Sequence, residues 1–346
     1  MKIAVFVEPG KVEAKELPKP EIKRPTDAIL KIVRACVCGS DLWWYRGISD
    51  RPKNTPVGHE AIGIVESVGS EVTNVKPGDF VVAPFTHGCG HCAACLAGFD
   101  GDCLNRPDTE VVGYQGEYLR FTNADWALIK IPGQPSDCSD AQLNDLLTLA
   151  DVMATGYHAA ASAEVKPGDT VVVMGDGAVG LCGVIAAKLR GAKRIIAMSR
   201  HEDRQKLAKE FGATDIIAER GDAAVKAVMD LTDGAGVDAV LECVGTEQSV
   251  DTAVKVGRPG AIVGRVGVPQ KAEMNTNELF WKNIGLRGGI ASVTTDDRAV
   301  LLNAVLKGQI HPGKVFTKRF DLDHVEEAYE AMDKREAIKS LLIVAK

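Results

Sequence analysis

A glycine-rich turn between a strand-like and a helix-like segment is the feature that most constrains the fold of this 346-residue chain. Gly175, Gly177 and Gly180 form a G-x-G-x-x-G pattern between the β-branched run 170–174 and the alanine-rich segment 178–190. In this context the first glycine permits a tight turn, the second lets the backbone approach a pyrophosphate, and the third lets helix and strand pack closely. The pattern therefore predicts a dinucleotide-binding turn rather than a simple bend.

Strand-like and helix-like segments alternate on both sides of this turn. The expected strands are 170–174, 194–198, 215–218, 237–243 and 261–266, and the expected helices are 178–190, 202–211, 223–231 and 248–256. Parallel strands need crossover connections, so this order predicts a doubly wound, Rossmann-type parallel sheet with helices on both faces. We expect this α/β dinucleotide-binding domain to occupy residues 153–292.

The rest of the chain has a different pattern. Short β-rich runs broken by glycine and proline, at 3–7, 28–35, 61–68 and 80–83, predict a mostly β domain over residues 1–152. The tail, 293–346, adds expected helices at 299–307 and 325–332 and expected strands at 315–320 and 340–344. We assign this tail to the first domain, although the sequence pattern alone does not prove that the domain is discontinuous.

Composition excludes several classes of partner. The net charge of −6 and the pI near 5.7 argue against nucleic acid or an anionic membrane, because neither polyanion is attracted by an acidic protein. The first residues resemble no signal peptide, and no segment approaches the roughly 20 apolar residues of a membrane span. We therefore expect a cytoplasmic protein with a small-molecule substrate, whose nine cysteines are not in disulfides.

Four cysteines lie close together, in a C-x2-C-x2-C-x7-C arrangement formed by Cys89, Cys92, Cys95 and Cys103. Four thiolates close a tetrahedral shell around Zn²⁺ and leave no open position, so the expected site is structural. An iron–sulfur cluster is the alternative. We interpret the neighbouring His87 and His91 as loop residues, and four of the other cysteines as buried small hydrophobic residues: Cys36, Cys138, Cys182 and Cys243.

The end of the second strand of the dinucleotide domain bears on the choice of dinucleotide. Many NAD sites have a carboxylate there, which binds the ribose 2′-hydroxyl. Here the strand is followed by Ser199 and Arg200, which offer a hydroxyl and a guanidinium to a 2′-phosphate. The sequence thus predicts NADP(H). A solvated surface position for Arg200 is the alternative, and Arg204, one helical turn on, is a further candidate contact.

Three short motifs supply possible metal ligands outside the four-cysteine loop: Cys38-Gly39-Ser40-Asp41, Gly58-His59-Glu60 and Asp151. Each alone is weak. In this order, with the four-cysteine loop and the glycine turn, they resemble the zinc-dependent medium-chain alcohol dehydrogenases, and among these the bacterial secondary-alcohol type. The resemblance covers essentially the whole chain. It implies a GroES-like catalytic domain beside the Rossmann-type domain.

The resemblance also implies roles for individual residues. Cys38, His59 and Asp151 would hold a catalytic zinc, with aspartate where many members have cysteine. Glu60 matches a residue that approaches the metal in relatives, and a purely structural role for it is the alternative. Ser40 matches the hydroxyl that accepts the alcohol proton.

Other implied positions are less specific. Asp41 would fix the ring of His59, and Trp43 stands where members with a longer proton relay have histidine, so the exit route for the proton stays open. Phe85, Trp43 and Tyr114 are candidates for the substrate pocket, with ordinary packing as the alternative. The implied dinucleotide contacts beyond the glycines are Thr155, Ala178, Val179, Val266, Val268 and Lys339.

The sequence thus predicts an enzyme that moves hydride between NADP(H) and an alcohol/carbonyl pair, secondary alcohols favoured, with two zinc ions per subunit in a homodimer or homotetramer. A polyol or sugar dehydrogenase of the same family is the nearest alternative. A zinc-free alkene reductase would have no use for the three catalytic ligands together. A non-catalytic NADPH-binding protein is a remote alternative, because a fold does not guarantee a function.

Overall fold

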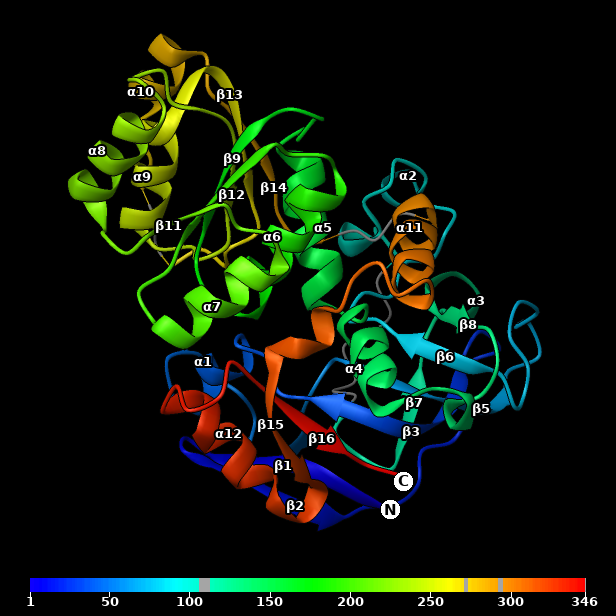
Figure 1. The fold of residues 1–346 in the computed structure, drawn as a ribbon. Coiled ribbons are helices and arrows are strands. Elements are labelled where there is room, and N and C mark those ends of the chain that lie inside the picture. Colours follow the sequence, from blue (N-terminus) through cyan, green and yellow to red (C-terminus); the bar gives the residue numbers. More distant parts are fainter. Residues whose placement is uncertain (106–112, 271–272, 292–294, 346) are drawn as a thin grey trace. The chain divides into compact units, whose positions relative to one another are not determined.

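The chain divides into two compact units in the computed structural model, which describes residues 1–105, 113–270, 273–291 and 295–345 (Figure 1). The first unit joins Met1–Asp151 to Ser292–Lys346, and the second is Val152–Ala291. The junction expected at residues 292 and 293 lies outside the described residues. Each unit is therefore considered by itself.

The first unit is built on two antiparallel-rich sheets. A small sheet has the order β2 (Lys11–Glu16), β1 (Lys2–Glu8), β4 (Thr55–Pro56). The main sheet has the order β15 (Phe316–Asp321), β16 (Lys339–Ile343), β3 (Ala28–Cys36), β5 (Ala61–Val68), β6 (Phe80–Ala83), β8 (Ile129–Ile131), and β7 (Tyr118–Phe121) also pairs with β3. Because β16 pairs with β3, the C-terminal tail is part of this sheet.

Short helices surround these sheets. They are α1 (Asp41–Tyr45), α2 (Ala93–Leu96), α3 (Ala124–Ala127), α4 (Asp140–Thr148), α11 (Thr295–Leu306) and α12 (Val325–Asp333), with 3-10 turns at Asp100–Asp102, Pro135–Asp137, Pro312–Val315 and Leu322–His324. Ser139 caps α4, its hydroxyl accepting the Gln142 N–H at 3.2 Å, which satisfies a free donor of the first turn. Tyr329 of α12 packs its ring against that of Trp44, and both rings belong to the hydrophobic core.

The second unit is a parallel sheet in the order β11 (Asp215–Ile217), β10 (Arg194–Met198), β9 (Thr170–Met174), β12 (Val237–Glu242), β13 (Gly257–Arg265), β14 (Gly285–Gly288). Its helices are α5 (Val152–Ser162), α6 (Ala178–Leu189), α7 (Glu202–Phe211), α8 (Gly221–Leu231), α9 (Glu247–Val256) and α10 (Thr276–Lys282). Figure 1 shows α8 and α9 on one side of this sheet and α5 and α6 on the other. The strand order reverses beside β9, where such sheets bind ligands at the carboxyl ends of the strands.

Most of the predicted elements of this sheet occur where expected. The strands at 170–174 and 194–198 and the helix at 202–211 have the predicted bounds. The strand expected at 261–266 begins earlier, at Gly257, because it continues along β12 through a register shift. The prediction of four buried cysteines was only half right, since Cys138 and Cys243 are partly exposed beside loops while the other two are buried.

None of the helices in residues 1–105, 113–270, 273–291 and 295–345 combines the length and the apolar character that crossing a membrane requires.

Candidate functional site

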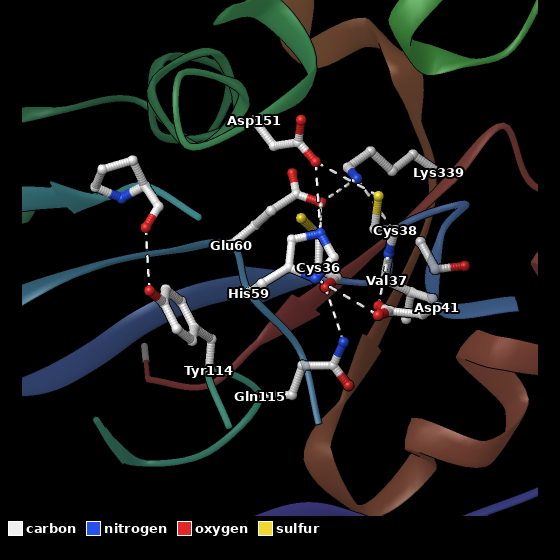
Figure 2. A network of polar contacts seen from close by, with 12 residues as sticks. Cys36, Val37, Cys38, Asp41, His59, Glu60, Tyr114, Gln115, Asp151 and Lys339 are labelled. Carbon is white, nitrogen blue, oxygen red and sulfur yellow. Dashed lines mark hydrogen bonds and ion pairs between the residues drawn. The ribbon is translucent and has the colours of Figure 1, made fainter. Parts of the chain in front are cut away.

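A cluster of potential metal ligands lies at one end of the main sheet of the first unit. One ligand atom from each of Cys38, His59, Glu60 and Asp151 lies within 4.8 Å of the others (Figure 2). Cys38 follows β3, whereas His59 and Glu60 precede the antiparallel partner strand β5, so pairing of these strands brings the two motifs together. Asp151 arrives after α4.

The distances in this cluster are those of groups that face a common centre. Asp151 Oδ2 lies 3.5 Å from Cys38 Sγ and 3.5 Å from His59 Nε2. Glu60 Oε1 lies 3.9 Å from His59 Nε2. Cys38, Glu60 and Asp151 are buried, and His59 keeps 28% of its side-chain surface exposed. The cluster therefore combines one sulfur, one imidazole and carboxylate oxygens in a largely water-excluded place.

Asp41 orients the other side of the histidine ring. Its Oδ1 lies 3.5 Å from His59 Nδ1, while its Oδ2 accepts the backbone N–H of Cys38 at 3.1 Å. This carboxylate favours the proton on Nδ1 and leaves Nε2, the nitrogen nearest Asp151, as the potential ligand. Asp41 thus ties two members of the cluster to one buried carboxylate.

Lys339 makes a contact that differs from its expected role. Its ammonium is 1% exposed, and it donates to Glu60 Oε1 at 2.7 Å and to the carbonyl of Val37 at 3.1 Å (Figure 2). Lys339 is therefore the ion-pair partner of Glu60 in this structure. Its expected contact with a pyrophosphate stays a prediction.

The charges in the cluster fit a bound cation. Burial and the nearby Asp151 raise the pKa of Cys38. Burial disfavours the imidazolium of His59, yet Asp41 and Cys38 raise its pKa well above the usual value. Both directions reflect negative charge gathered around a centre, and Glu60 Oε2 has no hydrogen-bond partner among the described residues. A divalent ion relieves both features, and this mixed donor set suits Zn²⁺.

The four-cysteine loop forms a second cluster. The Sγ atoms of Cys89, Cys92, Cys95 and Cys103 lie within 4.8 Å of one another. The distance from Cys92 Sγ to Cys103 Sγ is 3.9 Å, and tetrahedral Zn–S bonds of about 2.3 Å require sulfurs about 3.8 Å apart. This agreement fits a closed structural zinc site.

Backbone donors also prepare these sulfurs for a metal. The N–H groups of Cys95 and Leu104 point at Cys92 Sγ, at 3.5 and 3.4 Å, and lower the pKa of Cys92 to about 6. Arg298 fixes the loop from α11 by donating to Asp100 at 2.7 Å. The His91 ring lies 2.9 Å from the carbonyl of Cys89, and it belongs to no metal-ligand group in the described chain.

The glycine turn of the second unit satisfies each expected requirement. Gly175 has φ of +106°, a conformation that favours glycine, and a Cβ there would lie 2.9 Å from Val244. A Cβ on Gly180 would overlap the carbonyl of Gly175, so helix and strand approach closely. A Cβ on Gly177 would meet nothing within 4 Å, which leaves space for a ligand beside the backbone. The turn fits a dinucleotide.

The end of β10 contains a contact that the sequence did not predict. Ser199 and Arg204 both bond to the carboxylate of Asp176, the residue between the first two glycines. Arg200 is exposed. Position 176 is variable in the pattern G-x-G-x-x-G, so the pattern gives it no role. The one signal in the sequence was that this position holds an acidic residue.

The remaining expected positions fall in both units. Ser40 is exposed at the start of α1, and its hydroxyl makes no hydrogen bond with the described residues. Phe85 faces the cluster, its ring centroid 6.1 Å from that of His59. Tyr114 is instead a core residue, since it is buried and donates to the carbonyl of Pro84 at 3.0 Å.

Apart from Lys339, the dinucleotide positions outside the glycines lie in the second unit. Thr155 is buried in α5, and Ala178 and Val179 begin α6. The N–H of Val266 bonds to the carbonyl of Glu242 at 2.9 Å, and Val268 is exposed just beyond β13.

Comparison with known proteins decides the family. Residues 24–133 match the model of the alcohol dehydrogenase GroES-like domain, and residues 178–305 match that of the zinc-binding dehydrogenases. An alcohol dehydrogenase of Cupriavidus necator is 30% identical over 95% of this chain and 94% of its own. The chain belongs to the zinc-dependent alcohol dehydrogenase family.

Further relatives of this alcohol dehydrogenase cover it almost completely. The NADP-dependent isopropanol dehydrogenase of Thermoanaerobacter brockii is 33% identical over 96% of each chain. The solved structure of an alcohol dehydrogenase from a Thermus species superposes with a TM-score of 0.91, at 32% identity and over 100% of both chains. The protein is therefore a zinc-dependent oxidoreductase that acts on a small alcohol, and its two ligand clusters fit a catalytic and a structural zinc.

Proposed function

We propose that this alcohol dehydrogenase moves hydride between NADP(H) and a secondary alcohol/ketone pair. The observation that carries the proposal is the cluster of Cys38, His59 and Asp151. The same chain contains a dinucleotide-binding turn, and Ser199 and Arg200 follow the second strand of that domain. Curated relatives with similarity along nearly the whole chain include NADP-dependent isopropanol dehydrogenases of Clostridium beijerinckii and Thermoanaerobacter brockii.

Cys38, His59 and Asp151 would hold the catalytic zinc. When bound, zinc supplies Lewis acidity that polarises a carbonyl oxygen or lowers the pKa of an alcohol. One thiolate and one carboxylate balance the charge of the ion, and His59 adds a neutral nitrogen whose orientation Asp41 fixes. Glu60 accepts a hydrogen bond from Lys339 at 2.7 Å and would be a carboxylate able to approach the metal.

Ser40 is the residue that would accept the proton of the alcohol. It follows Cys38 by two positions, it is exposed, and its hydroxyl makes no hydrogen bond with described residues that would have to be broken first. Trp43 stands where longer relays have histidine, so the proton would leave Ser40 through the ribose hydroxyls of a bound dinucleotide or through water. Phe85 supplies an apolar wall beside His59.

The second unit would bind the dinucleotide. The free N–H groups at the start of α6, at Ala178 and Val179, and the open space at Gly177 suit a pyrophosphate. Ser199 and Arg200 would receive the 2′-phosphate. Thr155, Val179, Val266 and Val268 would surround the nicotinamide end of the cofactor.

A substrate panel tests the proposal. Purified enzyme is assayed with secondary alcohols, primary alcohols and polyols, each with NADP⁺ and NAD⁺, and its zinc content is measured in the same preparation. We expect two zinc ions per chain and the highest kcat/KM with a secondary alcohol. Full activity with one metal ion per chain, bound by the four cysteines, would refute the catalytic cluster, and a preference for sorbitol-like polyols would refute the substrate class.

We also propose that the enzyme works in the cytoplasm as a homodimer or homotetramer. Five of the nine cysteines lie in the two metal-ligand clusters, and such ligands need the unoxidised thiols that a reducing compartment maintains. Phe280 and Trp281 on α10 are 71% and 80% exposed, an unusual surface for a monomer. Light scattering of the purified protein should give two or four chains, and replacing both residues by serine should lower that number.

A further inference from the structure

Asp176 lies in the glycine turn, and its carboxylate is bonded to the end of β10. Its Oδ2 accepts the hydroxyl of Ser199 at 2.9 Å and the backbone N–H of Arg200 at 3.3 Å. Arg204 donates from Nη1 to Oδ1 and to the carbonyl of Asp176, both at 3.3 Å. One carboxylate thus binds the Ser199 hydroxyl expected at a 2′-phosphate and the guanidinium of Arg204, the further candidate contact.

This arrangement is built into the domain. Ser199 is buried, and the side chains of Arg204 and Asp176 are only 12% and 19% exposed. Gln205 donates to the carbonyl of Ser199 at 2.8 Å and fixes the turn that follows β10. Burial alone would raise the pKa of Asp176, but Ser199 and Arg204 lower it, so the carboxylate is ionised at neutral pH. A permanent negative charge therefore lies beside Ser199.

Such a charge affects the two dinucleotides in opposite ways. The 2′-phosphate of NADP(H) is anionic, so it is repelled by Asp176 and competes with it for Ser199 and Arg204. The 2′-hydroxyl of NAD(H) is a hydrogen-bond donor, and a carboxylate is the acceptor that NAD sites usually provide for it. Repulsion between unit charges about 4 Å apart is about 1 kcal/mol in water and about 4 kcal/mol near a protein surface.

We propose that Asp176 sets the dinucleotide preference of this enzyme by weakening the binding of the 2′-phosphate. The inference rests on the proposed function, in which Ser199 and Arg200 receive that phosphate. The side chain of Arg200 is exposed and can bind the phosphate directly. Ser199 and Arg204 can bind it only after their hydrogen bonds to Asp176 break. The natural enzyme therefore uses NAD(H) as well as NADP(H), and removing the charge of Asp176 turns it toward NADP(H).

Binding of small fragments tests the proposal without catalysis. Calorimetric titrations of the zinc-loaded enzyme compare adenosine 2′,5′-bisphosphate with adenosine 5′-monophosphate, for the natural protein and for Asp176→Asn. Asparagine keeps the size and an acceptor for Ser199 but removes the charge. We expect the affinity ratio of the two fragments to rise about tenfold, which corresponds to about 1.4 kcal/mol, and the kcat/KM ratio of NADP⁺ to NAD⁺ to rise with it.

Asp215 provides a matched control. Its carboxylate is also bonded to an arginine and a hydroxyl, Arg194 at 2.8 Å and Thr214 at 2.7 Å. It begins β11 and pairs with Ile196 in the middle of β10, and its carboxylate bonds to Arg194 at the start of β10, whereas Ser199 follows the end of that strand. Asp215→Asn should leave both ratios unchanged. An equal rise in this variant would overturn a local role for Asp176.

Arg204 tests the route by which Asp176 acts. In Arg204→Gln, the phosphate has no second guanidinium to gain, so adding Asp176→Asn should raise the fragment ratio by clearly less than tenfold. An undiminished rise would contradict competition for Arg204. If Asp176→Asn leaves the ratio unchanged or lowers it, the proposal is wrong, and a fall would mean that Asp176 holds Ser199 and Arg204 in place for the phosphate.

The two proposals fail in different ways. A natural enzyme that oxidises no alcohol with either dinucleotide refutes the proposed function, yet the fragment titrations still measure what Asp176 does.

Discussion

The two metal-ligand clusters of the first unit are built in opposite ways. The four cysteines lie within residues 89–103, in a loop that contains only the short helix α2 and one 3-10 turn. The other cluster joins Cys38 to Asp151, 113 positions away, and Cys38, His59 and Glu60 lie beside the ends of strands whose residues form the main core. The loop has too little apolar surface to fold alone, so metal binding contributes to its folding.

The catalytic cluster instead depends on the core for its geometry. Pairing of β3 with β5 and of β16 with β3 brings Cys38, His59 and Lys339 together. The four-cysteine site is therefore organised by its ion, and the catalytic cluster is organised by the main sheet. Substitutions that remove the ligands should therefore have different consequences in the two clusters.

The largest expected effect separates activity from stability. Cys38→Ala should lower kcat/KM for alcohol oxidation by about 10³-fold or more, because a Lewis acid supplies several kcal/mol to the transition state. The variant should lose one zinc ion per chain while its midpoint of thermal unfolding and its dinucleotide affinity stay close to those of the natural enzyme. Unfolding of this variant would contradict a cluster organised by the sheet.

The matched substitution in the loop should have the reverse pattern. Cys92→Ala leaves three sulfurs that cannot close a tetrahedral shell, so the loop should unfold locally and become sensitive to protease. Limited proteolysis followed by mass spectrometry locates the cut, and metal analysis should show that the catalytic zinc is retained. An intact loop after loss of its zinc would contradict the conclusion that the metal organises this loop.

A smaller effect is expected at the ion pair beneath the catalytic cluster. Lys339→Met leaves Glu60 as a buried charge without its partner and should lower the free energy of unfolding by about 3–5 kcal/mol. Adding Glu60→Gln should recover much of this loss, as denaturant titration can measure. The exposed pair of Lys318 and Glu336 is the control, since Lys318→Met should change stability by less than about 1 kcal/mol.

The smallest expected effect lies outside both clusters. Lys130 and Lys76 outweigh the effect of burial and lower the pKa of Asp79 to about 2 from its ordinary 3.8. The folded state thus binds this proton less readily than the unfolded state, so Asp79 stabilises the protein above about pH 4 and loses this contribution as the pH falls toward 2.

Asp79→Asn should accordingly cost about 1–2 kcal/mol at pH 7, with no change in zinc content. Its difference from the natural protein should shrink as the pH is lowered from 4 toward 2. A constant difference across this range would show that the side chain acts by packing and not by charge.

Much of the fold could be predicted because its signals are local. The period of apolar residues and the glycines marked β9, β10 and α7 to the residue, and spacing alone marked the four cysteines. The early start of β13 was missed because it depends on pairing with β12, a partner that no local pattern specifies. The resemblance to a family grouped Cys38, His59 and Asp151, which sequence distance would have kept apart.

The side-chain partners of the site could not be predicted in the same way. Lys339 was expected at a pyrophosphate, and the structure pairs it with Glu60, 279 positions away. Asp176 was an unremarkable residue of a glycine pattern until its contacts with Ser199 and Arg204 placed a fixed charge at the end of β10.

The two kinds of domain, the glycine turn and the sulfur ligands could be read from the sequence alone, since each depends on residues that are neighbours along the chain. The charge pairs Lys339–Glu60 and Arg204–Asp176 became visible only in the tertiary structure. Ion pairs and hydrogen bonds act over a few ångströms in space, and the pairing of distant strands brings those groups within reach.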